Sequence, residues 1–160
     1  MLFRSEAKRP DQKGVSGGII FSGSNVGIFY ATDIDNEGFQ RFTIGHELGH
    51  YFLEGHPEEI TKIAPMHISR AGFSQGKDFI ELEADHFSAG LLMPSGLVKR
   101  ELLGRPVGVD GILALAGRAK CSVTAAAIRA AQCSPYPVAI VVSTGEEICY
   151  GFLSDSFKSL

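Results

Sequence analysis

The stretch His46-Glu47-Leu48-Gly49-His50 decides how this chain is interpreted. In a helix, residues four positions apart lie on one face, so His46 and His50 can offer ring nitrogens to one metal ion. Glu47 then stands beside that ion, within reach of a water molecule. His-Glu-x-x-His on a helix is a zinc-site pattern of metallopeptidases, with the glutamate as general base. The pattern therefore predicts Zn²⁺ held by His46 and His50, with Glu47 as the catalytic residue.

The residues around this motif predict a buried helix over residues 39–54, because apolar side chains lie on more than one side of it. Gly49 costs about 1 kcal/mol of helix propensity in the interior, which packing or metal binding must offset. Gly55 predicts the end of this helix.

Upstream, the β-rich runs 17–22 and 26–31 flank a Gly-Ser-Asn turn and predict a hairpin, preceded by a possible N-terminal arm over residues 1–16. Downstream, residues 56–76 lack a clear period and are interpreted as a surface loop that can contain a short turn of helix. Further helices are expected at 78–93, 95–103, 110–118 and 122–132, followed by a C-terminal β-hairpin from 137–143 and 148–153.

The helix at 78–93 offers a third metal ligand. Glu81 and Asp85 are four positions apart and share a face, so Glu81 can bind the ion while Asp85 accepts a hydrogen bond from a ligand histidine. Glu83 lies about 200° round the helix from Glu81 and should face away from the metal. Glu81 is therefore the preferred ligand, and Glu83 is the alternative. Asp78 and Glu81 also fit a capping box, a competing role that a helix start near Ser74 would remove.

The remaining histidines, His56, His67 and His86, lack a comparable constellation. His67 could stabilise an oxyanion, but a solvated loop histidine is the preferred interpretation, and none of the three is assigned to catalysis. The chain also has three cysteines without Cys-x-x-Cys spacing, which favours small buried thiols in a reducing compartment: Cys121, Cys133 and Cys149.

Length and composition predict one domain over residues 1–160 that is cytoplasmic, because the 160 residues are 44% hydrophobic and carry neither a signal peptide nor a membrane-length apolar run. A net charge of −3 argues against nucleic acid or an anionic membrane as partner. The helices at 110–118 and 122–132 imitate a DNA-reading helix-turn-helix. Their alanine-rich surface offers only Arg129 as a base reader, so core packing is the preferred interpretation.

A family resemblance rests on two motifs, which together span about residues 41–94. The first is Arg41-Phe42-Thr43-Ile44-Gly45-His46-Glu47-Leu48-Gly49-His50, and the second is Glu81-x-x-Ala84-Asp85-x-Phe87-x-Ala89-x-Leu91-Leu92-Met93-Pro94. In this order they resemble the ImmA/IrrE family of zinc metallopeptidases. Ser88 departs from the alanine often found there, and the long segment before Glu81 is an individual feature.

The resemblance implies an α+β, zincin-like metalloprotease domain, in which helices carrying the metal site pack on a small β-sheet. It also implies His46, His50 and Glu81 on zinc with Glu47 catalytic, and a protein substrate, often a helix-turn-helix transcriptional repressor in stress or mobile-element control. An alternative is a regulatory protein-binding module that keeps the metal site without turnover. The intact Glu47 argues against that alternative, since a pure binder needs no general base.

Overall fold

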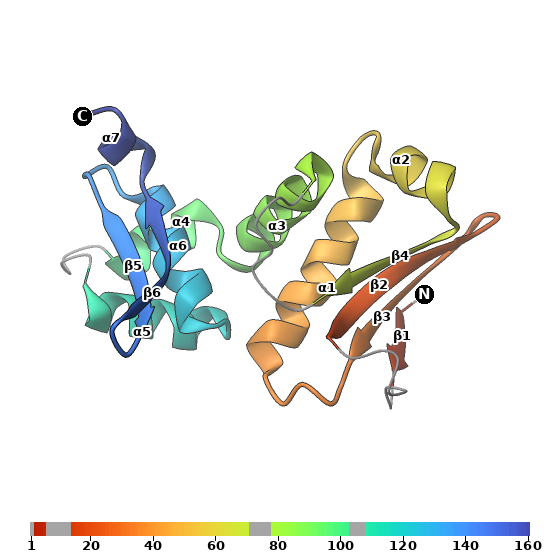
Figure 1. Ribbon diagram of the computed structural model, residues 1–160, viewed down its shortest axis with the longest axis horizontal. Coiled ribbons are helices and arrows are strands. Elements are labelled where there is room, and N and C mark those ends of the chain that lie inside the picture. The colour runs from red at the N-terminus through yellow and green to blue at the C-terminus, as the bar shows by residue number, and fades with distance from the viewer. Residues whose placement is uncertain (1, 6–13, 71–77, 103–107) are drawn as a thin grey trace. The chain divides into compact units, whose positions relative to one another are not determined.

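The structure is a computed structural model that describes residues 2–5, 14–70, 78–102 and 108–160 (Figure 1). The chain divides into two compact units, Met1–Leu92 and Met93–Leu160, each described here by itself. The predicted mixture of helices and small sheets, with a C-terminal β-hairpin, is confirmed. The expectation of one metallopeptidase domain over residues 1–160 concerns how the two units act together, and it stays a prediction.

The sheet of the first unit contains the predicted hairpin. Its strands are β2 (Val15–Ser22) and β3 (Asn25–Ala31), paired antiparallel across a two-residue turn. Gly23 in this turn has φ of 59°, a left-handed conformation that glycine adopts without strain. The predicted strand runs are each extended by one or two residues at their starts, since backbone pairing continues beyond the apolar side chains.

Two further strands complete the sheet in the order β1-β3-β2-β4. β1 (Leu2–Ser5) pairs parallel with β3, and β4 (Met66–Arg70) pairs antiparallel with β2. The prediction of an arm over residues 1–16 is therefore wrong for β1 and for the first residues of β2, because both are hydrogen-bonded into the sheet. Residues 6–13 of that arm lie outside the described residues.

Helix α1 (Glu37–Phe52) carries the decisive motif and packs on β2 and β3. The side chain of Asn36 begins it by accepting a hydrogen bond from the backbone N–H of Phe39 at 2.9 Å, a standard N-terminal cap. The apolar core beneath the helix holds Ile19, Ile28 and Ile60, with Phe21, Val26, Leu48 and Ile80 against them. The sheet thus gives α1 a fixed support.

Helix α3 (Phe79–Leu92) lies against α1, and two glycines of α1 allow the close approach. A Cβ atom at Gly49 would lie 3.0 Å from the Cα atom of Ala84, and one at Gly45 would lie 2.5 Å from the Ser88 hydroxyl oxygen. This packing is the compensation that an interior glycine requires. Ser88 is fully buried and donates a hydrogen bond to the carbonyl of Phe42 at 2.8 Å, so its hydroxyl joins the two helices.

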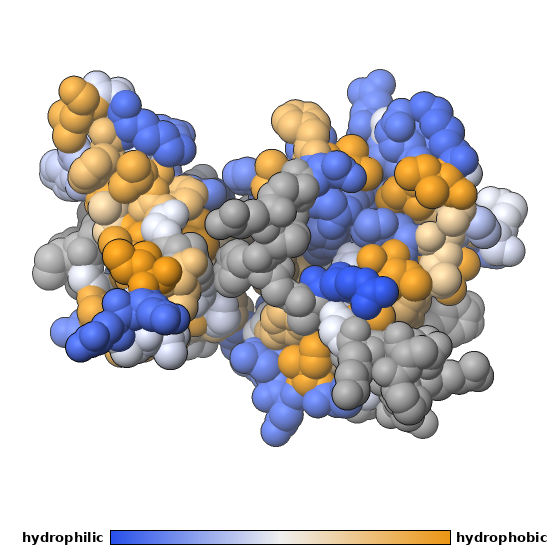
Figure 2. Space-filling model, in the orientation of Figure 1, coloured by the Kyte–Doolittle hydropathy of each residue, from blue (hydrophilic) through white to orange (hydrophobic). Residues whose placement is uncertain are grey.

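The segment 56–76 is not a surface loop in the part described, and the short turn of helix allowed for there is present. It contains α2 (His56–Ile63) and strand β4, which follow Gly55 at φ of 86°. Its residues 71–76 lie outside the described residues. The exposed side of α2 carries Glu58, Glu59 and Lys62, and hydrophilic surface gathers over this helix in Figure 2. The prediction failed because both elements are too short to set up a clear period.

In its described residues, the second unit contains three helices, the C-terminal hairpin and a final helical turn. The elements are α4 (Ser95–Leu102), α5 (Val109–Ala119), α6 (Val123–Cys133), β5 (Ala139–Thr144), β6 (Glu147–Leu153) and α7 (Asp155–Lys158). Its buried apolar residues include Met93, Val98, Leu115 and Ala126. Helices α5 and α6 pack on each other and on α4.

The preferred interpretation of α5 and α6 as core helices agrees with this packing. Ala126, Ala127 and Ala130 are buried, and the guanidinium Nε of Arg129 donates to the carbonyl of Met93 at 3.0 Å. Among the described residues, no single helix is long and apolar enough to cross a membrane. The two helices pass that test only together, as a pair bent by 111°.

Cys121, Cys133 and Cys149 form no disulfide among the described residues. Cys121 and Cys133 are half-buried, and the Cys121 sulfur lies 3.5 Å from that of Met93. The expectation of a small buried residue is wrong for Cys149, which is exposed on β6 of the two-stranded hairpin.

Candidate metal centre

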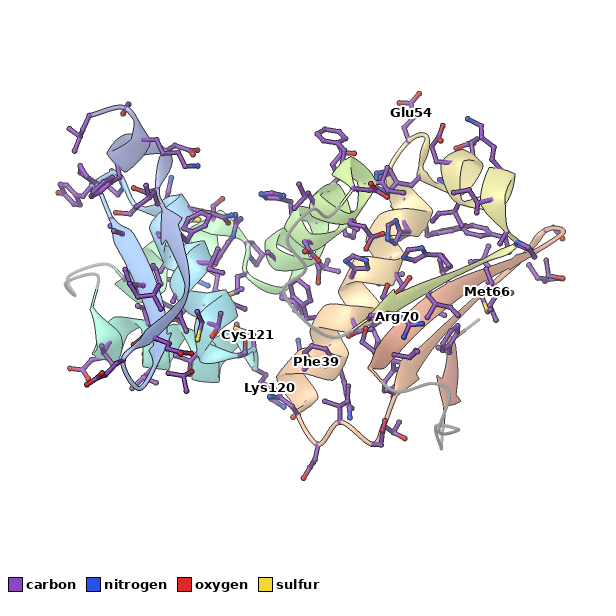
Figure 3. All side chains as sticks on the ribbon, viewed as in Figure 1. Phe39, Glu54, Met66, Arg70, Lys120 and Cys121 are labelled. Atoms are coloured by element: carbon purple, nitrogen blue, oxygen red, sulfur yellow. The ribbon has the colours of Figure 1, made fainter. Side chains whose placement is uncertain are left out.

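Four metal-binding side chains from three elements converge in the first unit. Figure 3 draws side chains with nitrogen and oxygen atoms beside α1, near α3 and the strand β4 that carries the labelled Met66 and Arg70. His46 and His50 come from α1, His67 from β4 and Glu81 from α3, and their ligand atoms all lie within 4.8 Å of one another. The Nε2 atom of His50 is 3.0 Å from that of His46 and 3.2 Å from Glu81 Oε1. Since ligands at 2.0–2.2 Å from a tetrahedral ion lie about 3.4 Å apart, these separations suit one ion.

The polar atoms of this group also need a partner. Glu81 Oε1 is buried and makes no hydrogen bond of acceptable geometry with any described residue, although the Nε2 atoms of His50 and His67 each lie 3.2 Å away. An anionic oxygen buried without a partner is costly. A cation at the point where these atoms converge would supply one, so the residues present fit a metal ion such as Zn²⁺.

Asp85 lies where the sequence places it, one turn along α3 from Glu81. Its Oδ1 atom is 2.9 Å from His46 Nδ1, the ring nitrogen directed away from the group. Helix α3 begins at Phe79, one residue after the expected start at Asp78, and the alternative start near Ser74 falls outside the described residues. Glu81 thus occupies the first turn, and its side chain nevertheless turns to the histidines instead of capping the helix.

Glu47 is fully buried beside the group. Its Oε1 atom accepts a hydrogen bond of 2.5 Å from the hydroxyl of Ser69 on β4. Its second oxygen, Oε2, has no hydrogen-bond partner among the described residues. One oxygen of the carboxylate is therefore held in place, and the other is available to accept a proton.

With this geometry established, the comparison with known families assigns the chain. The model of the IrrE N-terminal-like domain (Peptidase_M78) matches residues 9–131. The chain belongs to this family. The resemblance inferred from the two motifs is confirmed, and the match begins between β1 and β2 and ends inside α6. No curated protein matches the sequence. Membership in Peptidase_M78, together with the His/Glu group, suggests a metallopeptidase.

The electrostatics of this IrrE-like centre separate its two α1 histidines. Burial opposes charge on His46, but the carboxylates of Asp85 and Glu81 outweigh it and raise the pKa of His46 to about 9. Burial lowers the pKa of His50 from its ordinary value. Burial also acts to raise the pKa of Glu81, yet three adjacent histidines hold it well below the usual range. The metal-free centre therefore holds a proton on His46 and a negative charge on Glu81.

Burial raises the pKa of Glu47 from its ordinary value, so its net shift is opposite to that of Glu81. The Ser69 hydrogen bond and the charge of nearby His46 offset part of this effect. A carboxylate with a raised pKa is a better proton acceptor at neutral pH than an ordinary glutamate, which is the property expected of a general base.

Sequence reasoning missed His67 and Ser69. His67 is only 21% exposed in its side chain, and its interpretation as a solvated loop histidine is wrong. The pattern Met66-His67-Ile68-Ser69 contained a signal, because residues two apart in a strand share a face. His67 and Ser69 thus face the centre together, 3.4 Å apart between Nε2 and Oγ.

The contact of His56 with His50 and Glu83 was missed as well. His56 is buried, with its Nδ1 atom 3.1 Å from His50 Nδ1 and its Nε2 atom 3.1 Å from Glu83 Oε2. Glu83 does face away from the four-residue group, as its helical position predicts. The remaining histidine, His86, is exposed and contacts the carbonyl of Leu82 at 2.7 Å.

Proposed function

We propose that this protein is a zinc-dependent metallo-endopeptidase that hydrolyses peptide bonds of a protein substrate. The observation that carries the proposal is the state of Glu47: a buried carboxylate adjacent in sequence to a potential ligand, with one oxygen held by Ser69 and the other without a partner. A purely structural metal site has no use for such a group.

His46, His50 and Glu81 are proposed as the protein ligands, and Asp85 as the acceptor that orients His46. Their donor atoms lie 3.0–3.5 Å apart, and Asp85 contacts the outer nitrogen of His46. Two histidines and one glutamate form a known catalytic zinc set. When bound, zinc would polarise the scissile carbonyl and lower the pKa of a water molecule to about 7.

The protein's own part in hydrolysis falls to Glu47. Its Oε2 atom accepts a proton from the attacking water as the water oxygen bonds to the carbonyl carbon. The same proton then passes to the amide nitrogen as the carbon–nitrogen bond breaks, which leaves a carboxylic acid and an amine. Ser69 holds the carboxylate throughout by its bond to Oε1.

We further propose that the substrate is a helix-turn-helix transcriptional repressor and that the protein acts in the cytoplasm. The first part follows from the resemblance carried by the two sequence motifs, which implies such a substrate. The three cysteines, which form no disulfide among the described residues, are consistent with the second. Neither a membrane nor nucleic acid is proposed as a direct partner, given the net charge of −3.

The test is incubation of zinc-loaded wild type and Glu47→Gln with a purified helix-turn-helix repressor, followed by mass analysis of the products. Loss of a general base typically costs about 10²–10⁴-fold in rate. We expect Glu47→Gln to bind zinc as tightly as wild type and to lose cleavage by such a factor. Undiminished cleavage by this variant contradicts the proposal.

A second candidate function is favoured by His67. A catalytic zinc keeps one position free of protein ligands, whereas four protein ligands are typical of a closed, structural site. His67 Nε2 belongs to the same group of ligand atoms and lies 3.2 Å from Glu81 Oε1. A metal held by all four side chains would make this chain a regulatory protein-binding module without turnover.

Cobalt substitution separates the two candidates without an activity assay. An open site in the Co²⁺-loaded wild type should change its visible spectrum when azide is added. A site closed by His67 should respond only after His67→Ala frees a position. We expect wild type to respond, in agreement with the peptidase, and a response confined to His67→Ala would support the binding module.

A further inference from the structure

A series of three hydrogen-bonded side chains leads from the candidate metal centre to the exposed surface of α3. His50 is fully buried and directs Nε2 to the metal-binding group, while its Nδ1 atom lies 3.1 Å from His56 Nδ1. His56 is itself buried, and its Nε2 atom lies 3.1 Å from Glu83 Oε2. The Glu83 side chain is 44% exposed, so this series of side chains starts at a buried ligand and ends in contact with solvent.

The carboxylate of Glu83, the last residue of this series, decides which ring nitrogens of His56 and His50 carry a hydrogen. A carboxylate only accepts hydrogen bonds, so the Nε2 atom of His56 must carry the hydrogen that faces Glu83. In neutral His56 the other nitrogen, Nδ1, is then an acceptor. Two facing Nδ1 atoms need one hydrogen between them, so this hydrogen belongs to His50. The Nε2 atom of His50, which faces the group, is thereby left with a free lone pair.

We propose that Glu83 and His56 are positioning residues that fix His50 in the tautomer required for metal binding. The inference rests on the metal site of the proposed function but not on its catalytic role. Asp85 orients His46 directly at 2.9 Å, whereas His50 is oriented through an intervening imidazole. The metal affinity of the buried centre thus depends on the negative charge of Glu83, a half-exposed residue that lies outside the four-residue group.

Charge reversal at Glu83 provides a sharp test, because it exchanges the donor and the acceptor in each hydrogen bond of the series. A lysine only donates, so Glu83→Lys would make His56 Nε2 an acceptor, His56 Nδ1 a donor and His50 Nδ1 an acceptor. His50 Nε2 would then carry a hydrogen where the metal must bind. Glu83→Ala merely removes the preference, so it should weaken metal binding less than Glu83→Lys does.

The measurement is the Zn²⁺ dissociation constant of the full chain, obtained by competition with a chromogenic chelator. Second-sphere partners typically contribute about 10- to 100-fold to metal affinity, and we expect a loss of that size for Glu83→Lys. Glu58→Lys is the matched control, since Glu58 is an exposed glutamate of α2 and the change in net charge is identical. We expect this control to bind zinc nearly as wild type does.

Two further observations separate positioning from a general effect on folding. His56→Gln retains an acceptor for His50 and a donor for Glu83, so it should bind zinc more tightly than His56→Leu, which has neither. The ¹⁵N shifts of the His50 ring in the metal-free protein should place the hydrogen on Nδ1 in wild type and on Nε2 in Glu83→Lys. Thermal unfolding of each variant checks that it is folded.

The outcomes distinguish this inference from the proposed function. If wild type and His46→Ala bind zinc equally weakly, the metal site itself is wrong. If wild type binds zinc and His46→Ala does not, but Glu83→Lys matches Glu58→Lys, the site stands and the positioning role is overturned. An unchanged His50 tautomer in Glu83→Lys also overturns it.

Discussion

Ser69 donates a hydrogen bond of 2.5 Å to Oε1 of Glu47, and the two residues come from the edge strand β4 and the helix α1. Both side chains are buried, so solvent does not replace this bond when it is lost. The contact fixes which oxygen of the carboxylate is available for proton transfer. It also acts against the effect of burial, which raises the pKa of Glu47.

Ser69→Ala should therefore lower the peptidase rate and raise the pKa of Glu47 further. A hydrogen bond to a charged group is worth about 1.5–3 kcal/mol, which corresponds to about a 10- to 100-fold loss in kcat/KM. Because the base acts in its deprotonated form, the acidic limb of the pH–rate profile should move to higher pH. Ser69→Thr keeps the hydroxyl and should retain the wild-type limb; an equal shift in both variants would speak against this role.

The close contact of α1 with α3 predicts a stability difference between two glycine substitutions. A Cβ at Gly49 would lie 3.0 Å from the Cα of Ala84, whereas one at Gly90 of α3 meets nothing within 4 Å. Gly49→Ala should destabilise the protein by about 1–3 kcal/mol through overpacking. Gly90→Ala should stabilise it by up to about 1 kcal/mol through helix propensity. Urea unfolding of the metal-free variants measures both, and equal effects would refute the packing argument.

The sequence predicted this part of the fold well because its signals are local. Helices α1 and α3 were expected within two residues of their observed ends, from apolar stripes and from Pro94. The pair His46 and His50 is fixed by helical spacing, and Glu81 with Asp85 by the same rule on a second helix. The contact of the two helices was the one long-range step, and the paired motifs indicated it.

The missed residues depend on contacts between distant segments. β4 is five residues long and becomes recognisable only by pairing with β2, which lies far from it in sequence. His67 and Ser69 reach the centre through that pairing. His56 reaches the centre because the chain reverses direction at Gly55, which has φ of 86°. The pattern of residue types along the sequence does not specify this backbone angle. Such positions follow from tertiary packing, which a single sequence encodes only indirectly.

Metal removal should destabilise the first unit through the four-residue group. An ion that binds only the folded state stabilises it by about 2.7 kcal/mol when its concentration is 100 times the dissociation constant. We expect excess Zn²⁺ to raise the unfolding temperature of wild type and a chelator to reverse the increase. His46→Ala should show neither effect, while His86→Ala, at an exposed histidine outside the group, should behave as wild type. A zinc-induced increase that survives in His46→Ala places the ion elsewhere.

The contact of Asp85 with His46 predicts how the metal-free protein responds to pH. The pKa of His46 is raised from 6.5 to about 9, so the folded state binds its proton more tightly than the unfolded state does. That contribution to stability is fully present below pH 6.5 and is lost as pH rises through about 9, by on the order of 1–3 kcal/mol. Asp85→Asn removes a main cause of the raised pKa, so its unfolding free energy should fall less over the same interval. Urea unfolding with a chelator at pH 6, 7.5 and 9 measures the difference, and parallel curves for the two proteins would show that Asp85 does not hold the proton on His46.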